Sequence, residues 1–163
     1  MEADKLEIHK LYNTAGYPLL DELGLKRSEY IQKFTFHRYP ATFDEASYIC
    51  KQEGGHLAVV TSKEDEREML ALWARSGQVV NPSHGLNAQA FIGLQLSSRG
   101  WQTVFGGYPP YLNWSSNWWG RQQPDNPTIQ KCGSLLKQGG MDDVHCYYKL
   151  AFFCGKLASP HYW

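Results

Sequence analysis

Residues 42–60, TFDEASYICKQEGGHLAVV, hold the pattern from which the fold of this chain can be worked out. Thr42 is an N-cap candidate and Glu45 follows three residues later, which is the spacing of a capping box. Apolar side chains then recur along one helix face: Phe43, Ala46, Ile49 and Cys50. The pair Gly54-Gly55 ends this helix. Residues 56–60 are short and apolar and predict a strand. The stretch is therefore a helix that turns sharply into a strand.

The flanking segments extend this unit into an order of helices and short strands. Before it, residues 31–38 alternate, with Phe34 and Phe36 on one face, and predict a strand. After it, Thr61 or Ser62 caps a second helix. The expected buried stripe of that helix is Met69, Leu70, Leu72 and Trp73. A loop at 77–89 leads to further short segments, expected at 90–94, 101–105, 111–114, 132–136, 144–148 and 150–154. This order is typical of the α+β class.

Length and charge limit the classes of function. The chain has 163 residues, which suits one domain. Its 16 basic and 16 acidic side chains give a formal net charge of zero. Without a basic excess, nucleic acid is not expected as a partner, and without a long apolar run, insertion into a membrane is not expected. Aromatic residues make up 14 % of the chain, which points to a binding surface.

The four cysteines are Cys50, Cys132, Cys146 and Cys154. They show no C-x-x-C spacing, so zinc-ribbon and thioredoxin-like sites lack support. An even count without metal spacing favours two disulfides and an oxidising, extracellular compartment. Cys50 with Cys154 would join the two ends of the domain, and Cys132 with Cys146 would join neighbouring strands. The sequence by itself leaves the two other pairings open. No apolar h-region follows Met1, so a secreted form is expected to have lost its signal peptide already.

Residues 115–131, SSNWWGRQQPDNPTIQK, form a long irregular segment. The segment is too polar for a core element and too aromatic for a mere linker. Long loops inside compact domains are usually functional. A binding site is therefore expected in this loop.

Several motifs follow one another in a fixed order: the helix to Cys50, Gly54-Gly55-His56-Leu57, Phe91-Ile92-Gly93-Leu94, Trp101, Leu112-Asn113-Trp114, Gln123-Pro124-Asp125-Asn126 and three cysteines. Through these motifs the chain resembles a C-type lectin-like domain from about Tyr30 to Lys156, most of all the soluble insect lectins. The resemblance implies an α+β fold with two helices flanking two small antiparallel sheets and a long irregular binding loop. It divides the chain into an N-terminal extension at 1–29, a lectin domain at 30–156 and a tail at 157–163. It also implies the bridges Cys50–Cys154 and Cys132–Cys146.

The resemblance further implies one calcium ion, held at the sugar-binding site by side-chain oxygens, which are the ligands that calcium prefers. In the family these oxygens come from a Gln-Pro-Asp or Glu-Pro-Asn triplet with a cis proline, a Glu before the next cysteine, and a Trp-Asn-Asp motif. The matching positions are Gln123, Asp125, Gln130, Asp142 and Asp143. Gln130 replaces an acid and Asp142 replaces an amide, so the set keeps three carboxylates and every member still offers an oxygen. A second ion site is not expected, because residues 90–124 contain no Asp or Glu.

The triplet Gln123-Pro124-Asp125 implies galactose-type sugars. A sugar hydroxyl between an acid and an amide donates to one and accepts from the other, so exchanging the two reverses that order. Gln130 and Asp142 are exchanged relative to the family and oppose the order of the triplet. Trp118 or Trp119 is expected to stack on the sugar, or else to pack the loop onto the body. The implied protein is a secreted lectin of innate immunity that recognises microbial surface glycans. A homo-oligomer is compatible with it.

Two other functions remain as alternatives. In a calcium-independent protein-interaction module, the loop would bind a protein, and Gln130 and Asp142 would be ordinary surface residues. An enzyme is not expected. Asp125 and Asp143 would have to serve as a glycosidase acid/base pair, or His145 would have to activate a free thiol beside it.

Overall fold

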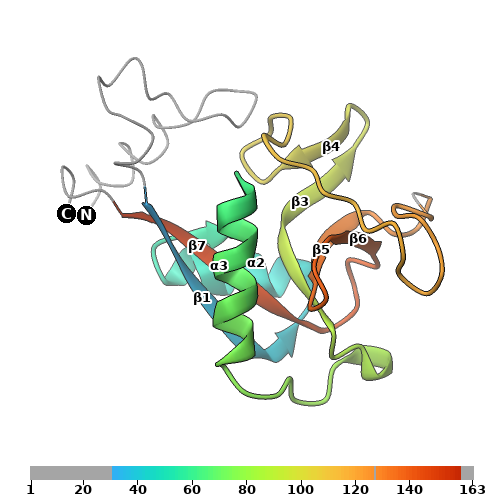
Figure 1. The fold of residues 1–163 in the computed structure, drawn as a ribbon. Helices are drawn as coiled ribbons and strands as arrows, with labels where there is room; N and C mark the ends of the chain where they lie inside the picture. Colours follow the sequence, from blue (N-terminus) through green and yellow to red (C-terminus); the bar gives the residue numbers. More distant parts are fainter. Residues whose placement is uncertain (1–30, 127, 159–163) are drawn as a thin grey trace.

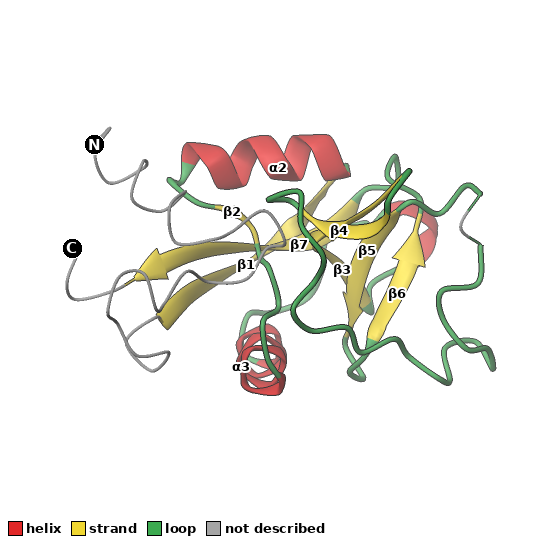
Figure 2. Ribbon diagram, turned by 90° about the horizontal axis from the view of Figure 1, so that it is seen from above, coloured by secondary structure: helices red, strands yellow, loops and turns green. Residues whose placement is uncertain are grey.

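The computed structural model of this chain describes residues 31–126 and 128–158. The predicted N-terminal extension at 1–29, and residues 159–163 of the predicted tail, lie outside the described residues. Within the described ranges, the strands form one sheet with a helix on each face (Figures 1 and 2). Figure 2 shows α2 above this sheet and α3 below it.

The sheet follows the order β1-β7-β3-β5-β6, with β2 paired to β7 and β4 paired to β3. The strands are β1 (Ile31–Ala41), β2 (His56–Leu57), β3 (Gln89–Ser97), β4 (Gly100–Thr103), β5 (Cys132–Leu136), β6 (Met141–Val144) and β7 (Leu150–Ala158). The α+β class is confirmed, but the two expected sheets are joined into one. The reason is a short parallel pairing of β3 with β7, in which Ala90 lies opposite Ala151 and Phe91 opposite Phe152.

Helix α2 (Phe43–Gln52) begins at the predicted cap. The Thr42 side chain accepts the N–H of Glu45, and the Glu45 carboxylate accepts the N–H of Thr42 at 2.9 Å. This reciprocal pair confirms the capping box. Beyond the helix, Gly54 has a φ of +86°, which favours glycine. A Cβ on Gly55 would lie 2.2 Å from the carbonyl oxygen of Gly155, so the turn brings β2 against β7 more closely than a side chain allows.

Helix α3 (Lys63–Ala74) is capped by Ser62, whose hydroxyl accepts the N–H of Asp65. Its buried stripe is narrower than predicted, because Met69 and Trp73 are fully buried whereas the two leucines are half-buried. Among the residues that the structure describes, no helix is both long and apolar enough to cross a membrane.

The sheet separates two apolar layers, because successive residues of a strand point to opposite faces. Phe43, Phe91 and Phe152 pack together on the side of α2. Trp73 and Phe153 pack together on the side of α3, with ring centroids 5.8 Å apart. Both faces of the central strands are therefore buried, which makes the sheet a rigid support for the loop beside it.

Two disulfides reinforce this frame. Cys50 on α2 is bonded to Cys154 on β7, and Cys132 on β5 is bonded to Cys146. Both pairings agree with those that the resemblance implies. The second bridge joins the strand after the long loop to the turn after β6, so it anchors both segments that carry the predicted ligands.

The strands predicted at 56–60 and 101–105 are shorter, at His56–Leu57 and Gly100–Thr103, and two segments near the acidic residues of β6 differ more from their predicted structure. The strand expected at 144–148 is β6, which starts three residues earlier, and residues 111–114 contribute only a bridge between Trp114 and Met141. The cause is the pair Gly139-Gly140, whose positive φ values of 96° and 87° allow a tight turn between β5 and β6. This early turn places Asp142 and Asp143 inside a strand, where pairing with β5 fixes their backbone.

Candidate functional site: an acidic cluster and its pocket

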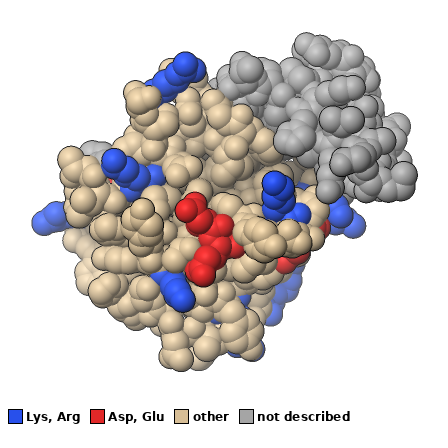
Figure 3. Space-filling model, turned by 180° about the vertical axis from the view of Figure 1, so that it is seen from behind, with Lys and Arg blue, Asp and Glu red and all other residues tan. Residues whose placement is uncertain are grey.

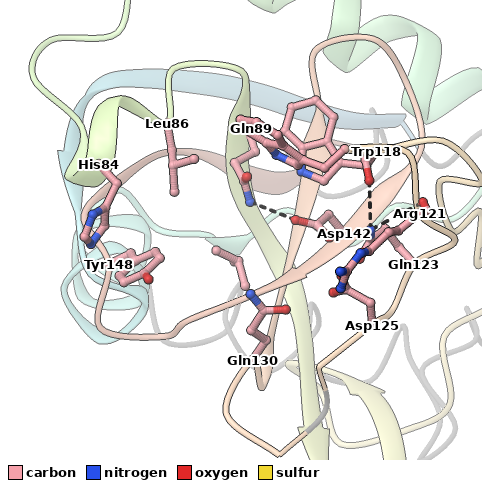
Figure 4. A pocket seen from close by; sticks show the side chains of 12 residues that line it. His84, Leu86, Gln89, Trp118, Arg121, Gln123, Asp125, Gln130, Asp142 and Tyr148 are labelled. Carbon is pink, nitrogen blue, oxygen red and sulfur yellow. Dashed lines mark hydrogen bonds and ion pairs between the residues drawn. The ribbon is translucent and has the colours of Figure 1, made fainter.

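The five predicted ligand residues come together in space. Gln123, Asp125 and Gln130 lie on the long loop, and Asp142 and Asp143 lie on β6. One carboxylate oxygen from each aspartate lies within 4.8 Å of the other two. Figure 4 shows four of these side chains converging from the loop and from the strand. We call these five residues the acidic cluster.

Backbone hydrogen bonds hold the loop against β6. The fully buried Asp143 carboxylate accepts the N–H of Asp125 at 3.0 Å and that of Asn126 at 2.8 Å. The N–H of Gln123 donates to the carbonyl of Ser115 at 2.7 Å, which closes the loop on itself. The Gln123–Pro124 peptide bond is cis, as the resemblance implies. The loop therefore has a defined shape before any ligand arrives.

The amide of Gln123 lies at the centre of the cluster and is almost fully buried. One end of the amide is 2.7 Å from Asp142 Oδ1, 2.9 Å from Asp125 Oδ1 and 3.0 Å from Asp143 Oδ1. The other end is 3.3 Å from the carbonyl oxygen of Trp118. Both ends thus face hydrogen-bond acceptors, whereas an amide has one donor end. Whichever end carries the nitrogen, the amide oxygen faces other oxygens.

This arrangement fits a calcium ion. When the nitrogen of Gln123 donates to Trp118 and the aspartates are ionised, its oxygen joins the three carboxylates in a group of oxygens that a cation would balance. The amide end of Gln130 is 3.1 Å from Asp125 Oδ1 and 3.2 Å from Asp143 Oδ2, so it can contribute another oxygen. Calcium–oxygen distances are about 2.3–2.6 Å, so two oxygens on one ion lie at most about 5 Å apart. The carboxylate separations meet that limit.

Ionising the cluster without a cation is costly. Burial, and after it the charge of Asp143, raise the pKa of Asp142 to about 8, while a hydrogen bond from Gln89 opposes the shift. Burial also raises the pKa of Asp143, against the N–H groups of Asn126 and Asp125, which lower it. A divalent cation favours the ionised form of both carboxyls. A cation bound among these carboxylates would therefore offset the cost of ionising them.

The cluster borders a pocket of about 450 Å³ (Figure 4). Trp118, Trp119 and Arg121 line it from the loop. Trp118 is half-buried, whereas Trp119 is 75 % exposed, with a φ of +54° in the tight turn that Trp118 and Arg121 close. The Arg121 guanidinium lies 3.8 Å from the Asp125 carboxylate. Both predicted tryptophans thus stand beside the acidic cluster.

Sequence reasoning missed several side chains at this pocket. Gln89 at the start of β3 is buried, and its amide donates to Asp142 Oδ2 at 3.1 Å and to Ser134 Oγ at 3.2 Å. His84, Leu86 and Tyr148 line the pocket as well. Gln89 directly precedes the apolar run 90–94, and a polar residue at the start of a buried strand could have been recognised as a candidate from the sequence. No spacing in the sequence connects the other three residues with the loop.

A buried carboxylate on α3 supports the loop and the hairpin together. Glu66 accepts hydrogen bonds from Tyr111 Oη at 3.1 Å, from Asn113 Nδ2 at 3.1 Å and from the N–H of Gly140 at 3.3 Å. It thus connects α3, the segment that leads into the loop, and the turn before β6. From the sequence, Glu66 was expected only to favour the start of the helix.

The surface charges and the disulfides bear on the alternative functions. On the face shown in Figure 3, the largest group of Asp and Glu side chains lies near the centre, whereas Lys and Arg side chains are spread over several places around it. No continuous basic surface forms on the described part of that face. Cys146 is bonded to Cys132, so it offers His145 no thiol nucleophile.

Comparisons with known proteins identify the family of the chain. The family model described as Lectin C-type domain matches residues 39–156. Over 134 residues the chain is 32 % identical to a hemolymph lipopolysaccharide-binding protein of Periplaneta americana. The aligned region covers 80 % of this chain and 51 % of that protein. Over 119 residues it is 33 % identical to tetranectin of Mus musculus, covering 71 % and 54 % respectively. The chain thus spans about half the length of these relatives.

Solved structures share the fold. The carbohydrate-recognition domain of a mouse scavenger receptor C-type lectin has a TM-score of 0.59 at 23 % identity, covering 77 % of this chain and 89 % of that one. The C-type lectin CEL-I of Cucumaria echinata has a TM-score of 0.63 at 17 % identity, covering 78 % and 91 %. These structures confirm the fold, and the family model and the P. americana relative confirm the prediction of a non-enzymatic binding domain. The chain belongs to the C-type lectin domain family.

Proposed function

We propose that the chain is a calcium-dependent lectin for galactose-type sugars, in which the acidic cluster holds both the ion and the sugar. The observation that carries the proposal is the Gln123 amide, which faces acceptors at both ends. A bound calcium ion would supply the positive charge that balances the cluster and an anchor for two sugar hydroxyls. Gln123, Asp125, Gln130, Asp142 and Asp143 would be its ligands.

The order of acids and amides would select the sugar. A hydroxyl beside an aspartate donates its proton to the carboxylate, and beside a glutamine it accepts an amide proton. The order of Gln123 and Asp125 is the galactose order, so galactose or N-acetylgalactosamine should compete better than mannose. Gln130 and Asp142 oppose it, so binding to a single sugar should be weak and multivalent glycans should bind through avidity. The exposed Trp119 ring would stack on the apolar face of the sugar.

The biological setting of the proposal is extracellular defence against microbes. The P. americana relative is named for hemolymph and for lipopolysaccharide, a microbial glycolipid. Two disulfides suit an oxidising compartment. We propose the lectin domain at 30–156, between an extension at 1–29 and a tail at 157–163, whose first two residues, Leu157 and Ala158, still belong to strand β7. A homo-oligomer would supply the avidity that weak single sites need.

A calcium titration read by thermal shift tests the ion, and elution from a galactose-coated matrix tests the sugar. Calcium should raise the melting temperature, chelation should reverse the rise, and magnesium should not replace calcium. Galactose should then elute the bound protein at a lower concentration than mannose does. A melting temperature that does not respond to calcium would contradict the proposal.

A calcium-independent protein-interaction module is the second candidate, and the same cluster favours it in one respect. If the nitrogens of both amides face the carboxylates, the two N–H groups of Gln123 are shared among three carboxylate oxygens, and those of Gln130 donate to two, at 2.7–3.2 Å. The cluster would then be cross-linked without an ion. In that case calcium leaves the melting temperature unchanged, and the sugar matrix retains no protein.

A further inference from the structure

The pocket extends well beyond the acidic cluster. The cluster borders one side of its roughly 450 Å³, whereas His84, Leu86 and Tyr148 line another part (Figure 4). Figure 4 shows His84 and Tyr148 side by side, across the pocket from Gln123 and Arg121. We call His84, Leu86 and Tyr148 the ring wall.

The ring wall is held in place by the chain itself. The N–H of Ser83 donates to the carbonyl of Lys149 at 2.9 Å, and the N–H of Lys149 donates to Ser83 Oγ at 2.8 Å. These two bonds fasten the 3₁₀ turn of His84 to the segment of Tyr148, and the two rings lie 4.7 Å apart between centroids. The Tyr148 ring also lies 4.9 Å from the ring of His145, between centroids. The wall is therefore ordered before a ligand binds, which lowers the entropy cost of binding.

We propose that the ring wall is a second sugar subsite, so that the pocket takes an oligosaccharide of at least two rings. The inference rests on the proposed function, because the first ring must be held at the acidic cluster. A sugar anchored there through its hydroxyls would occupy one side of the pocket, and the ring wall lines the part that remains for a second ring.

The chemistry of the wall matches a sugar ring. Leu86 and the edge of the Tyr148 ring offer apolar surface to C–H groups of the sugar. The phenol oxygen of Tyr148 and the imidazole nitrogens of His84 can donate to and accept from its hydroxyls. A pocket with apolar surface and a few polar groups at fixed positions is the usual form of a small-ligand site.

The test compares monosaccharides with disaccharides by calorimetry in the presence of calcium. The probes are galactose with lactose, and mannose with α-1,2-mannobiose. We expect a disaccharide to bind about tenfold more tightly than its own monosaccharide, which is the order of gain that one aromatic contact gives. Tyr148→Ala should remove that gain and leave monosaccharide affinity within about twofold. Tyr147→Ala is the matched control, because Tyr147 is 82 % exposed and does not line the pocket.

The outcomes separate the subsite from the proposed function. Equal affinities for monosaccharides and disaccharides would overturn the subsite and leave the lectin function standing. If Tyr148→Ala lowered the affinities for monosaccharide and disaccharide equally, the subsite would also be overturned, since Tyr148 would then act through the acidic cluster. Binding of no sugar would overturn both proposals. NMR of the unmodified chain needs no variant: the His84 ring signals should shift with a disaccharide and not with a monosaccharide, and signals unmoved by either would overturn the subsite.

Discussion

Asp142→Asn separates the electrostatic cost of the acidic cluster from its role in binding. Asp142 is 5 % exposed, and its pKa is raised to about 8 by burial and by Asp143. Asparagine keeps an oxygen for the amide of Gln89 but carries no charge. A carboxyl with a raised pKa in the folded protein binds its proton more tightly there than in the unfolded chain. Without calcium, Asp142 therefore makes the free energy of unfolding fall as pH rises from about 4 to about 8.

The size of this effect follows from the shift in pKa. Each pH unit between the unfolded and folded pKa values changes the free energy of unfolding by about 1.4 kcal/mol. Between pH 4 and pH 7, the free energy of unfolding of the wild-type protein should therefore fall by on the order of 4 kcal/mol because of Asp142. Asp142→Asn should not show this part of the fall. The assay is urea denaturation of both proteins in a chelator at several pH values. The difference between the two proteins reports Asp142 together with its coupling to Asp143, and it removes the contribution of the carboxyls that do not interact with Asp142.

Calcium should narrow the difference in stability between the two proteins. An ion present at about 100 times its dissociation constant stabilises the folded state by about 2.7 kcal/mol, which raises the melting temperature of a chain of this size by about 5–10 °C. Calcium should raise the melting temperature of Asp142→Asn by less, because the variant keeps an oxygen ligand but loses a charge. A difference between the two proteins that does not change with pH in chelator would refute the electrostatic reasoning. So would a variant that is less stable than the wild type at pH 7 without calcium.

Asp143→Ala should abolish the calcium-induced rise in melting temperature, because it removes a ligand and a charge together; a rise that persists in a thermal-shift titration would contradict this role. Gln130→Glu combined with Asp142→Asn keeps three carboxylates and restores the family's order of acid and amide. Galactose should then outcompete mannose more strongly on a galactose-coated matrix, and unchanged selectivity would refute the donor–acceptor argument. Glu66→Ala should lower the free energy of unfolding by about 3 kcal/mol in urea, because three donors lose their shared acceptor. The exposed Glu68→Ala on the same helix is the control and should change it by less than about 0.5 kcal/mol.

Elements with contiguous signals could be predicted from the sequence. The capping box of Thr42 and Glu45, and the turn at Gly54-Gly55, depend on neighbours a few residues away, and both form as expected. Strand β6 could not be placed correctly, because residues 141–144 include two acids and look like a solvated turn. This segment is a strand because the turn at Gly139-Gly140 returns it to β5, a partner that local patterns do not specify. The parallel pairing of β3 with β7 is likewise a contact between distant segments.

The sequence by itself determined the chemistry that this domain carries: three carboxylates and two amides at the positions of the family's ligand set, and four cysteines in the family's order. Donor capacity and formal charge belong to the residue type, so they can be read without coordinates. Only the tertiary structure decided what Asp142, Gln123 and Tyr148 face. Burial raises the pKa of Asp142. One end of the Gln123 amide lies beside three carboxylates, and Tyr148, from a distant segment of the chain, lines the same pocket. Desolvation and short distances between remote segments exist only after the chain has folded, and for that reason no local pattern reports them.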